Sequence, residues 1–211
     1  VNGNVDLYAV VFNRTTETDL TEDQLPQVDI YKYKQVIFVG DSRTEFMENV
    51  LTGMGESATK NVKFVCSAGK GLDWFTTTGW AQLYSIVQHD SNSILSKKTA
   101  VIFNFGVNDL SKSADYAEYY NWIAPQLKSK GCELYFMSVN PVNRLMLPNA
   151  GRADRSEAAV RSFNQYMKAN LSSAYTYIDM YSYLKSTGYS FASDHYGTGT
   201  VDDGLHYTTR T

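Results

Sequence analysis

Short apolar runs alternate with amphipathic stretches along the chain from residue 35 onward. The apolar runs are rich in β-branched and aromatic residues, and their length suits strands that are buried on both faces of a parallel sheet. The sequence therefore predicts strands at Gln35–Val39, Val62–Cys66, Ala100–Phe105, Glu133–Val139 and Tyr175–Asp179.

The stretches between these strands carry apolar residues at helical spacing. One predicted helix follows Ser42, and the others hold Trp80 to Val87, Tyr116 to Leu127 and Val160 to Leu171. Pro125 lies inside the third of these helices and is expected to kink or shorten it. Five strands alternating with helices predict an α/β fold, a three-layer α/β/α sandwich around a parallel sheet. We expect the flavodoxin-like strand order 2-1-3-4-5.

Residues 1–33 do not follow this alternation. Val5 to Val11 is strand-like, whereas Asn13 to Gln27 is polar and reads as a linker. We therefore expect an N-terminal tail or linker over residues 1–33 and one domain over residues 34–211. The start at Val1 fits either a piece of a longer protein or removal of an initiator methionine.

Composition and net charge limit the classes of protein to which the chain can belong. Hydrophobic residues make up 43% of the 211 residues and charged residues 19%, as in a globular domain of ordinary size. The net charge of -3 argues against nucleic acid as the main partner. No apolar run is long enough to span a bilayer, and no signal peptide is recognised. Cys66 and Cys132 are expected to be buried thiols at opposite ends of the sheet, too far apart for a disulfide.

Polar side chains follow several of the predicted strands. Ser42 follows the first strand, after Gly40 and Asp41. The second strand is followed by a glycine-rich loop, Ser67 to Leu72, and the third by Asn108, after Gly106. Near the end of the chain, a carboxylate and an imidazole stand three residues apart at Asp203 and His206. The carboxyl ends of parallel strands form the edge where α/β sheets bind ligands, so these groups are expected to converge there.

Each of these features also has a simpler interpretation. Ser42 and Asn108 could belong to ordinary turns or helix caps, and His206 could be a surface or core histidine. Asp202, Asp203, His195 and His206 could form a metal site, although Asp-Xaa-Xaa-His without further clear ligands is thin support for one.

Taken together, these blocks resemble the SGNH, or GDSL-type, serine hydrolases, from Gln35 to the C-terminus. Gly40-Asp41-Ser42 matches the first block of that family, Gly106-Val107-Asn108-Asp109 the third and Asp203-Gly204-Leu205-His206 the fifth. In the second block the family's glycine corresponds to Gly71, with Gly69 as the alternative. The family has a further helix after the histidine block, and this chain stops at Thr211, so a segment is missing or the histidine loop is less firmly anchored.

The chemistry assigns a role to each group. Ser42 is the candidate nucleophile, and His206 the base, because it alone among these residues titrates near neutral pH. Asp203 would orient the imidazole. The backbone N–H groups of Ser42 and Gly71 and the side-chain amide of Asn108 would form the oxyanion hole. Asp109 is expected to support the loops rather than react.

The resemblance implies hydrolysis of carboxylic esters through an acyl-enzyme, without a cofactor or metal. We expect a short-chain, acetyl ester, on a carbohydrate or a small molecule, as the substrate. A lipase or acyltransferase of the same family, a glycan- or protein-binding module on the same fold and, less favoured, a phosphate binder that uses the Ser67 to Leu72 loop remain open.

Gly3 to Phe12 resembles the closing strand of small β-repeats in Gram-positive cell-surface proteins. This resemblance implies a secreted or cell-surface protein with further domains as partners. The alternative is an extra edge strand on this domain, and a cytoplasmic location stays open.

Overall fold

The structure is a computed structural model. It describes residues 33–53, 55, 60–89, 98–143, 147, 155–189 and 204–207. The predicted tail with its strand-like segment lies outside these residues, except for Tyr33.

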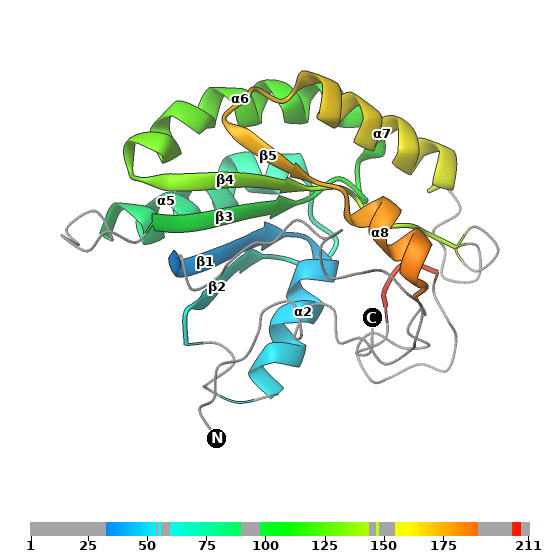
Figure 1. Cartoon of the computed structure of the whole chain (residues 1–211), viewed down its shortest axis with the longest axis horizontal. Coiled ribbons are helices and arrows are strands. Elements are labelled where there is room, and N and C mark those ends of the chain that lie inside the picture. Colours follow the sequence, from blue (N-terminus) through cyan, green and yellow to red (C-terminus); the bar gives the residue numbers. More distant parts are fainter. Residues whose placement is uncertain are drawn as a thin grey trace.

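A five-stranded parallel sheet forms the centre of the domain (Figure 1). Every neighbouring pair of strands is parallel, and the order is β2-β1-β3-β4-β5. The predicted fold class and strand order are thus confirmed. The strands are β1 (Tyr33–Gly40), β2 (Val62–Cys66), β3 (Lys98–Asn104), β4 (Cys132–Met137) and β5 (Tyr175–Ile178).

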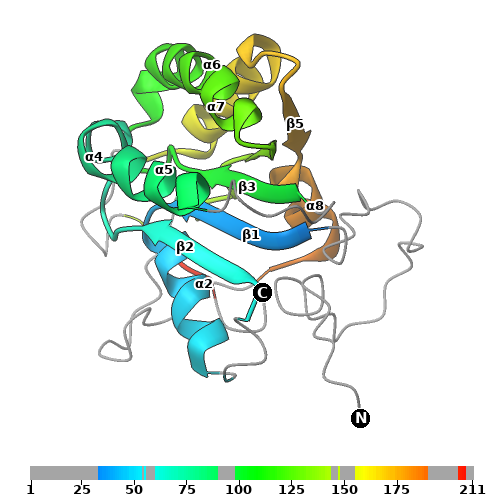
Figure 2. The same ribbon diagram turned by 90° about the vertical axis from the view of Figure 1, so that its left-hand side faces the viewer.

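Helices cover both faces of the sheet (Figure 2). One face packs against α2 (Ser42–Gly53) and α8 (Met180–Thr187). The other face packs against α5 (Trp80–His89), α6 (Ser113–Ser129) and α7 (Glu157–Asn170). Short helical segments precede two of these helices: α4 (Leu72–Trp74) with a π-helical turn (Phe75–Gly79) before α5, and a 3-10 turn (Leu110–Lys112) before α6.

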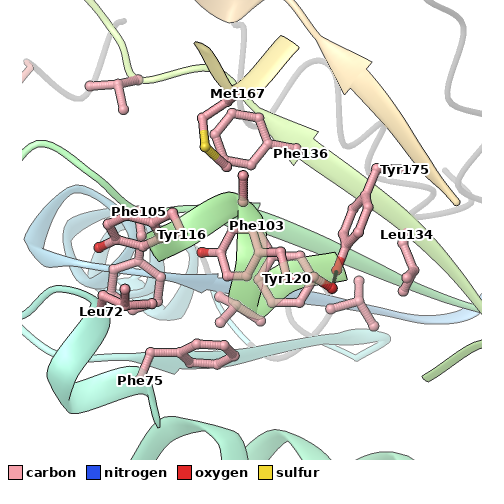
Figure 3. Packing of buried hydrophobic residues seen from close by; sticks show 14 of the residues in the cluster. Leu72, Phe75, Phe103, Phe105, Tyr116, Tyr120, Leu134, Phe136, Met167 and Tyr175 are labelled. Carbon is pink, nitrogen blue, oxygen red and sulfur yellow. Dashed lines mark hydrogen bonds between the residues drawn. The ribbon is translucent and has the colours of Figure 1, made fainter. Parts of the chain in front are cut away.

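The alternation of side chains along each strand divides the core into two layers. In β1, Ile37 and Val39 face the layer under α5, α6 and α7, whereas Val36 and Phe38 face the layer under α2 and α8. Rings dominate the first layer, as Figure 3 shows for Phe75, Phe103, Tyr120 and Tyr175 among others. The Phe103 and Tyr120 ring centroids lie 4.7 Å apart. Much of the high aromatic content therefore stabilises the core.

Two helices bear on the sequence predictions. Of the two effects expected of Pro125, shortening does not occur, because α6 runs on to Ser129. Pro125 is exposed while Ile123, Ala124 and Leu127 beside it are buried, so burial of this face outweighs the lost hydrogen bond. The helix α8 was not predicted, because it spans only 8 residues and buries only Met180 and Leu184.

The two cysteines lie at opposite ends of the sheet and are both free thiols. Cys132 is buried as predicted. Cys66 is only partly buried, since it ends the edge strand β2, and its thiol donates to the Glu48 carboxylate. Among the helices of the described residues, none combines the length and apolar character needed to cross a membrane.

Candidate active site

A tight corner between β1 and α2 positions Ser42. A Cβ atom at Gly40 would lie 1.9 Å from Thr44 Oγ1 and 2.9 Å from the Asn104 carbonyl oxygen, so only glycine fits there. The Asp41 carboxylate accepts a hydrogen bond from the Arg43 N–H, at 3.0 Å. Ser42 is therefore the first residue of α2, where backbone N–H groups lack partners within the helix.

Ser42 meets His206 from the far end of the chain. His206 Nε2 lies 2.7 Å from Ser42 Oγ, although 164 residues separate the two. Both side chains are buried, with exposed fractions of 4% and 1%. A hydrogen bond shielded from water in this way is electrostatically stronger than an exposed one. The structure thus brings together the hydroxyl and the imidazole that the sequence singled out.

Arg43 links α2 to the segment 204–207, which carries His206 and is called the histidine loop below. Its guanidinium donates to three backbone carbonyls, those of Leu205 at 2.9 Å, Asn140 at 3.1 Å and Pro141 at 2.9 Å. The guanidinium also lies over the Tyr207 ring, 5.4 Å from its centroid. One side chain next to Ser42 therefore joins the loop that carries His206 to the loop that follows β4.

The loop after β4 lies beside the histidine loop. The Asn143 N–H donates to the Gly204 carbonyl at 2.8 Å. Farther back, the Asn164 side chain accepts from the Val139 N–H at 2.7 Å and donates to the Val139 carbonyl at 2.8 Å. These contacts hold the loop against α7, so the site has a rigid support on this side.

The Asn108 side chain has one hydrogen-bond acceptor and one hydrogen-bond donor as partners. Its Nδ2 donates to the Lys70 carbonyl at 2.8 Å, and its Oδ1 accepts from the Arg155 guanidinium at 2.8 Å. An amide nitrogen carries two hydrogens, so one remains for a further acceptor. The Lys70 carbonyl faces Asn108, and hence the Gly71 N–H of the same trans peptide points away from it.

Asp109 supports the glycine-rich loop. Its carboxylate accepts from the Leu72 N–H and from the Tyr116 hydroxyl, each at 2.8 Å. A Cβ atom at Gly71 would lie 2.2 Å from Asp109 Oδ2, so a side chain at this position would displace the carboxylate. Gly69, the alternative glycine, has a positive φ of +71° and open space around it.

Burial shifts the pKa values of both aspartates near Ser42. Burial raises the pKa of Asp41 to about 6, against the opposing effect of the Arg43 guanidinium and the Arg43 N–H. Burial also raises the pKa of Asp109, while the hydrogen bonds from Leu72 and Tyr116 act in the other direction. Asp41 accepts from the Arg43 N–H and Asp109 from the Leu72 N–H and the Tyr116 hydroxyl, so each carboxylate supports the backbone around the site.

Several predicted residues lie outside the described part of the chain. These are Asp203, the proposed partner of His206, and Asp202 and His195 of the alternative metal site. Within the part that the structure describes, no group of three His, Cys, Asp or Glu side chains could hold a metal ion.

Two arginines near the site, Arg43 and Arg155, could not be assigned a role from the sequence. Arg43 directly follows Ser42, so its position offered a signal, but nothing local shows which carbonyls it reaches. Arg155 stands 47 residues from Asn108 in the sequence, and no motif links them. Long-range contacts of this kind follow from the fold and cannot be read from spacing.

Comparison with known proteins identifies the fold. No protein-family profile and no curated protein matches the chain. A candidate SGNH hydrolase from Slackia heliotrinireducens superimposes with a TM-score of 0.57 at 14% identity, over 84% of this chain and 91% of its own. A candidate acylhydrolase from Bacteroides fragilis has a TM-score of 0.55 at 16% identity, over 99% and 89% of the two chains. The acetyl xylan esterase AlAXEase has a TM-score of 0.50 at 12% identity, over 83% and 92%. At such low identity the likeness establishes the fold alone, which is that of the SGNH hydrolases.

Proposed function

We propose that this chain is a serine esterase of the SGNH hydrolase type, which cleaves short-chain carboxylic esters through an acyl-enzyme. The observation that supports this most directly is the 2.7 Å contact between Ser42 Oγ and His206 Nε2. A serine hydroxyl becomes a useful nucleophile only when a base accepts its proton, and a neutral imidazole at this distance can do so.

The reaction would run in two steps. Ser42 Oγ attacks the ester carbonyl as its proton passes to His206, and the imidazolium then protonates the leaving alcohol as the ester bond breaks. In the second step a water molecule gives a proton to His206, attacks the acyl-enzyme and releases the carboxylic acid with restoration of the Ser42 hydroxyl. Asp203 is proposed to hold the imidazole in the tautomer with Nε2 unprotonated, so that it can accept the serine proton.

The negative charge that develops on the carbonyl oxygen during the attack must be stabilised by hydrogen-bond donors. The Ser42 N–H at the start of α2 offers one, with the positive end of the helix dipole behind it. The second hydrogen of the Asn108 amide offers another. Gly71 could add a third only after the Lys70–Gly71 peptide rotates, because its N–H points away from Asn108 as the loop stands.

We propose an acetyl group on a glycan as the substrate. The fold likeness to an acetyl xylan esterase supports this class of substrate, as does the resemblance of Gly3 to Phe12 to surface-protein repeats. The same resemblance supports a secreted or cell-surface location with further domains as neighbours. A module that only binds glycans or proteins has no use for a buried serine–imidazole pair, which is why we favour the enzyme.

Hydrolysis of p-nitrophenyl esters of increasing chain length, beside acetylated oligosaccharides, tests the proposal. Ser42→Ala should abolish turnover, and His206→Ala should be nearly as damaging, whereas Asp203→Ala should cost less because other contacts keep part of the orientation. The matched control is Ser186→Ala, which removes an exposed hydroxyl on α8. Unchanged turnover in Ser42→Ala would remove this serine from the mechanism. Faster cleavage of long-chain than of acetyl esters would point to a lipase.

A further inference from the structure

Arg155 contacts Asn108, the side chain proposed for the oxyanion hole, through the oxygen of its amide. It immediately precedes Ser156, the N-cap of α7. Its Nε donates to the Val107 carbonyl at 2.9 Å, and its Nη2 donates to Asn108 Oδ1 at 2.8 Å. The two bonds engage consecutive residues of one loop, so the guanidinium fixes both the backbone and the side chain of this segment.

These contacts determine which way the Asn108 amide points. A guanidinium can only donate, so the atom that faces Arg155 must be the amide oxygen. A backbone carbonyl can only accept, so the atom that faces Lys70 must be the amide nitrogen. The two neighbours agree, and a flipped amide would break both hydrogen bonds at once.

We propose that Arg155 is a positioning residue for the oxyanion hole, which holds the Asn108 amide so that its remaining N–H can donate to the reacting carbonyl, and which strengthens that N–H as a donor. The proposal rests on the function proposed above. A charge-assisted hydrogen bond to the amide oxygen draws electron density from the amide nitrogen, so its remaining N–H becomes a better donor. This donor acts on charge that develops in the transition state, so its effect should fall on kcat rather than on KM.

The replacements Arg155→Lys and Arg155→Ala test the proposal. Lysine keeps the charge but, as a point donor, cannot serve Val107 and Asn108 in the geometry of the guanidinium fork. Loss of one oxyanion donor typically costs about 10²–10³ in kcat. Weakening a donor should cost less than removing it, and we expect a fall in kcat of about 10-fold for Arg155→Lys and about 10- to 100-fold for Arg155→Ala, with KM within about 2-fold. Arg161→Ala, at an exposed arginine of α7, is the matched control and should leave kcat unchanged.

A double-mutant cycle separates positioning from a general structural role. If Arg155 acts through Asn108, Arg155→Lys should lower kcat about 10-fold in the native background and by less than about 2-fold in Asn108→Ala. Equal losses in both backgrounds would overturn the proposal, as would a change in KM alone. The cycle uses Arg155→Lys and not Arg155→Ala, so the conclusion does not depend on whether Arg155→Ala folds.

Two readouts separate this proposal from the proposed function. The first is labelling of Ser42 by a fluorophosphonate, located by mass spectrometry. Without labelling or ester turnover in the native protein, the esterase proposal falls and the role of Arg155 falls with it. With labelling, and with equal losses across the cycle, only the role of Arg155 falls.

The second readout does not need turnover. The side-chain amide signals of Asn108 in a ¹H–¹⁵N spectrum, assigned by their loss in Asn108→Ala, should shift in Arg155→Lys and stay in place in Arg161→Ala. Unshifted signals in Arg155→Lys would mean that the guanidinium does not set the state of this amide.

Discussion

The buried carboxyl of Asp41 should make the stability of the domain depend on pH in a defined direction. Its pKa is raised from 3.8 to about 6, chiefly by burial. The native state then binds this proton more tightly than the unfolded chain does. The contribution to stability is therefore fully present below pH 3.8 and is lost as pH rises through about 6.

The replacement Asp41→Asn isolates this effect. Asparagine keeps an oxygen that can accept from the Arg43 N–H, but it does not ionise. A rise in pKa from 3.8 to about 6 corresponds to about 3 kcal/mol at 1.36 kcal/mol per unit. Relative to the native protein, Asp41→Asn should therefore gain up to about 3 kcal/mol in free energy of unfolding between pH 4 and pH 7.5. That is a large part of the about 5–15 kcal/mol typical of a domain.

Urea unfolding of both proteins over this pH range measures the difference. Taking the difference removes the titrations that both proteins share, provided that the m-values agree. Asp115→Asn removes an exposed carboxyl on α6 and separates burial from the loss of one charge. A difference between Asp41→Asn and the native protein that stays flat, or falls as pH rises, would refute burial as the dominant effect on this carboxyl.

Four further changes test packing and positioning. Arg43→Lys keeps the charge but cannot serve three carbonyls, so we expect a loss of about 1–3 kcal/mol and a lower kcat, measured by urea unfolding and ester turnover; native values of both would contradict this role. Gly71→Ala should displace the Asp109 carboxylate and cost about 1–3 kcal/mol in thermal unfolding, whereas a native melting temperature would show that the loop yields freely. The buried Tyr120 hydroxyl has no hydrogen-bond partner within the described residues, so Tyr120→Phe should be neutral or stabilising. The Tyr175 hydroxyl donates to the Tyr120 carbonyl at 2.7 Å, so Tyr175→Phe should lower the free energy of unfolding by about 1 kcal/mol. A larger loss in Tyr120→Phe than in Tyr175→Phe would contradict this account.

The proposals on the active site depend on contacts between distant segments. Ser42, Arg43 and His206 meet because β1 ends beside the histidine loop, and Arg43 reaches Leu205 across 162 residues of sequence. Asn108 and Arg155 meet because α7 packs beside the 3-10 turn that follows Asp109.

The sheet could be predicted because its signals are local. Each strand is a run of apolar residues a few positions long, and Gly40 marks the exit of β1 before Ser42. The pattern of strands and helices then leaves few right-handed parallel arrangements, and the flavodoxin-like order that we expected among them is the one in the structure. Ser42, Asn108 and His206 could be singled out as candidates for a similar reason, since each stands in a short recognisable block.

Contacts made through space were beyond such patterns. Nothing near Pro125 in the sequence reveals that its neighbours bury enough surface to keep α6 intact. The pKa of Asp41 depends on its burial and on the charge of Arg43, and the orientation of the Asn108 amide depends on Arg155. Backbone propensity and side-chain periodicity act over a few residues, whereas burial, electrostatics and hydrogen-bond geometry arise only when the folded chain brings remote groups within a few ångströms of each other.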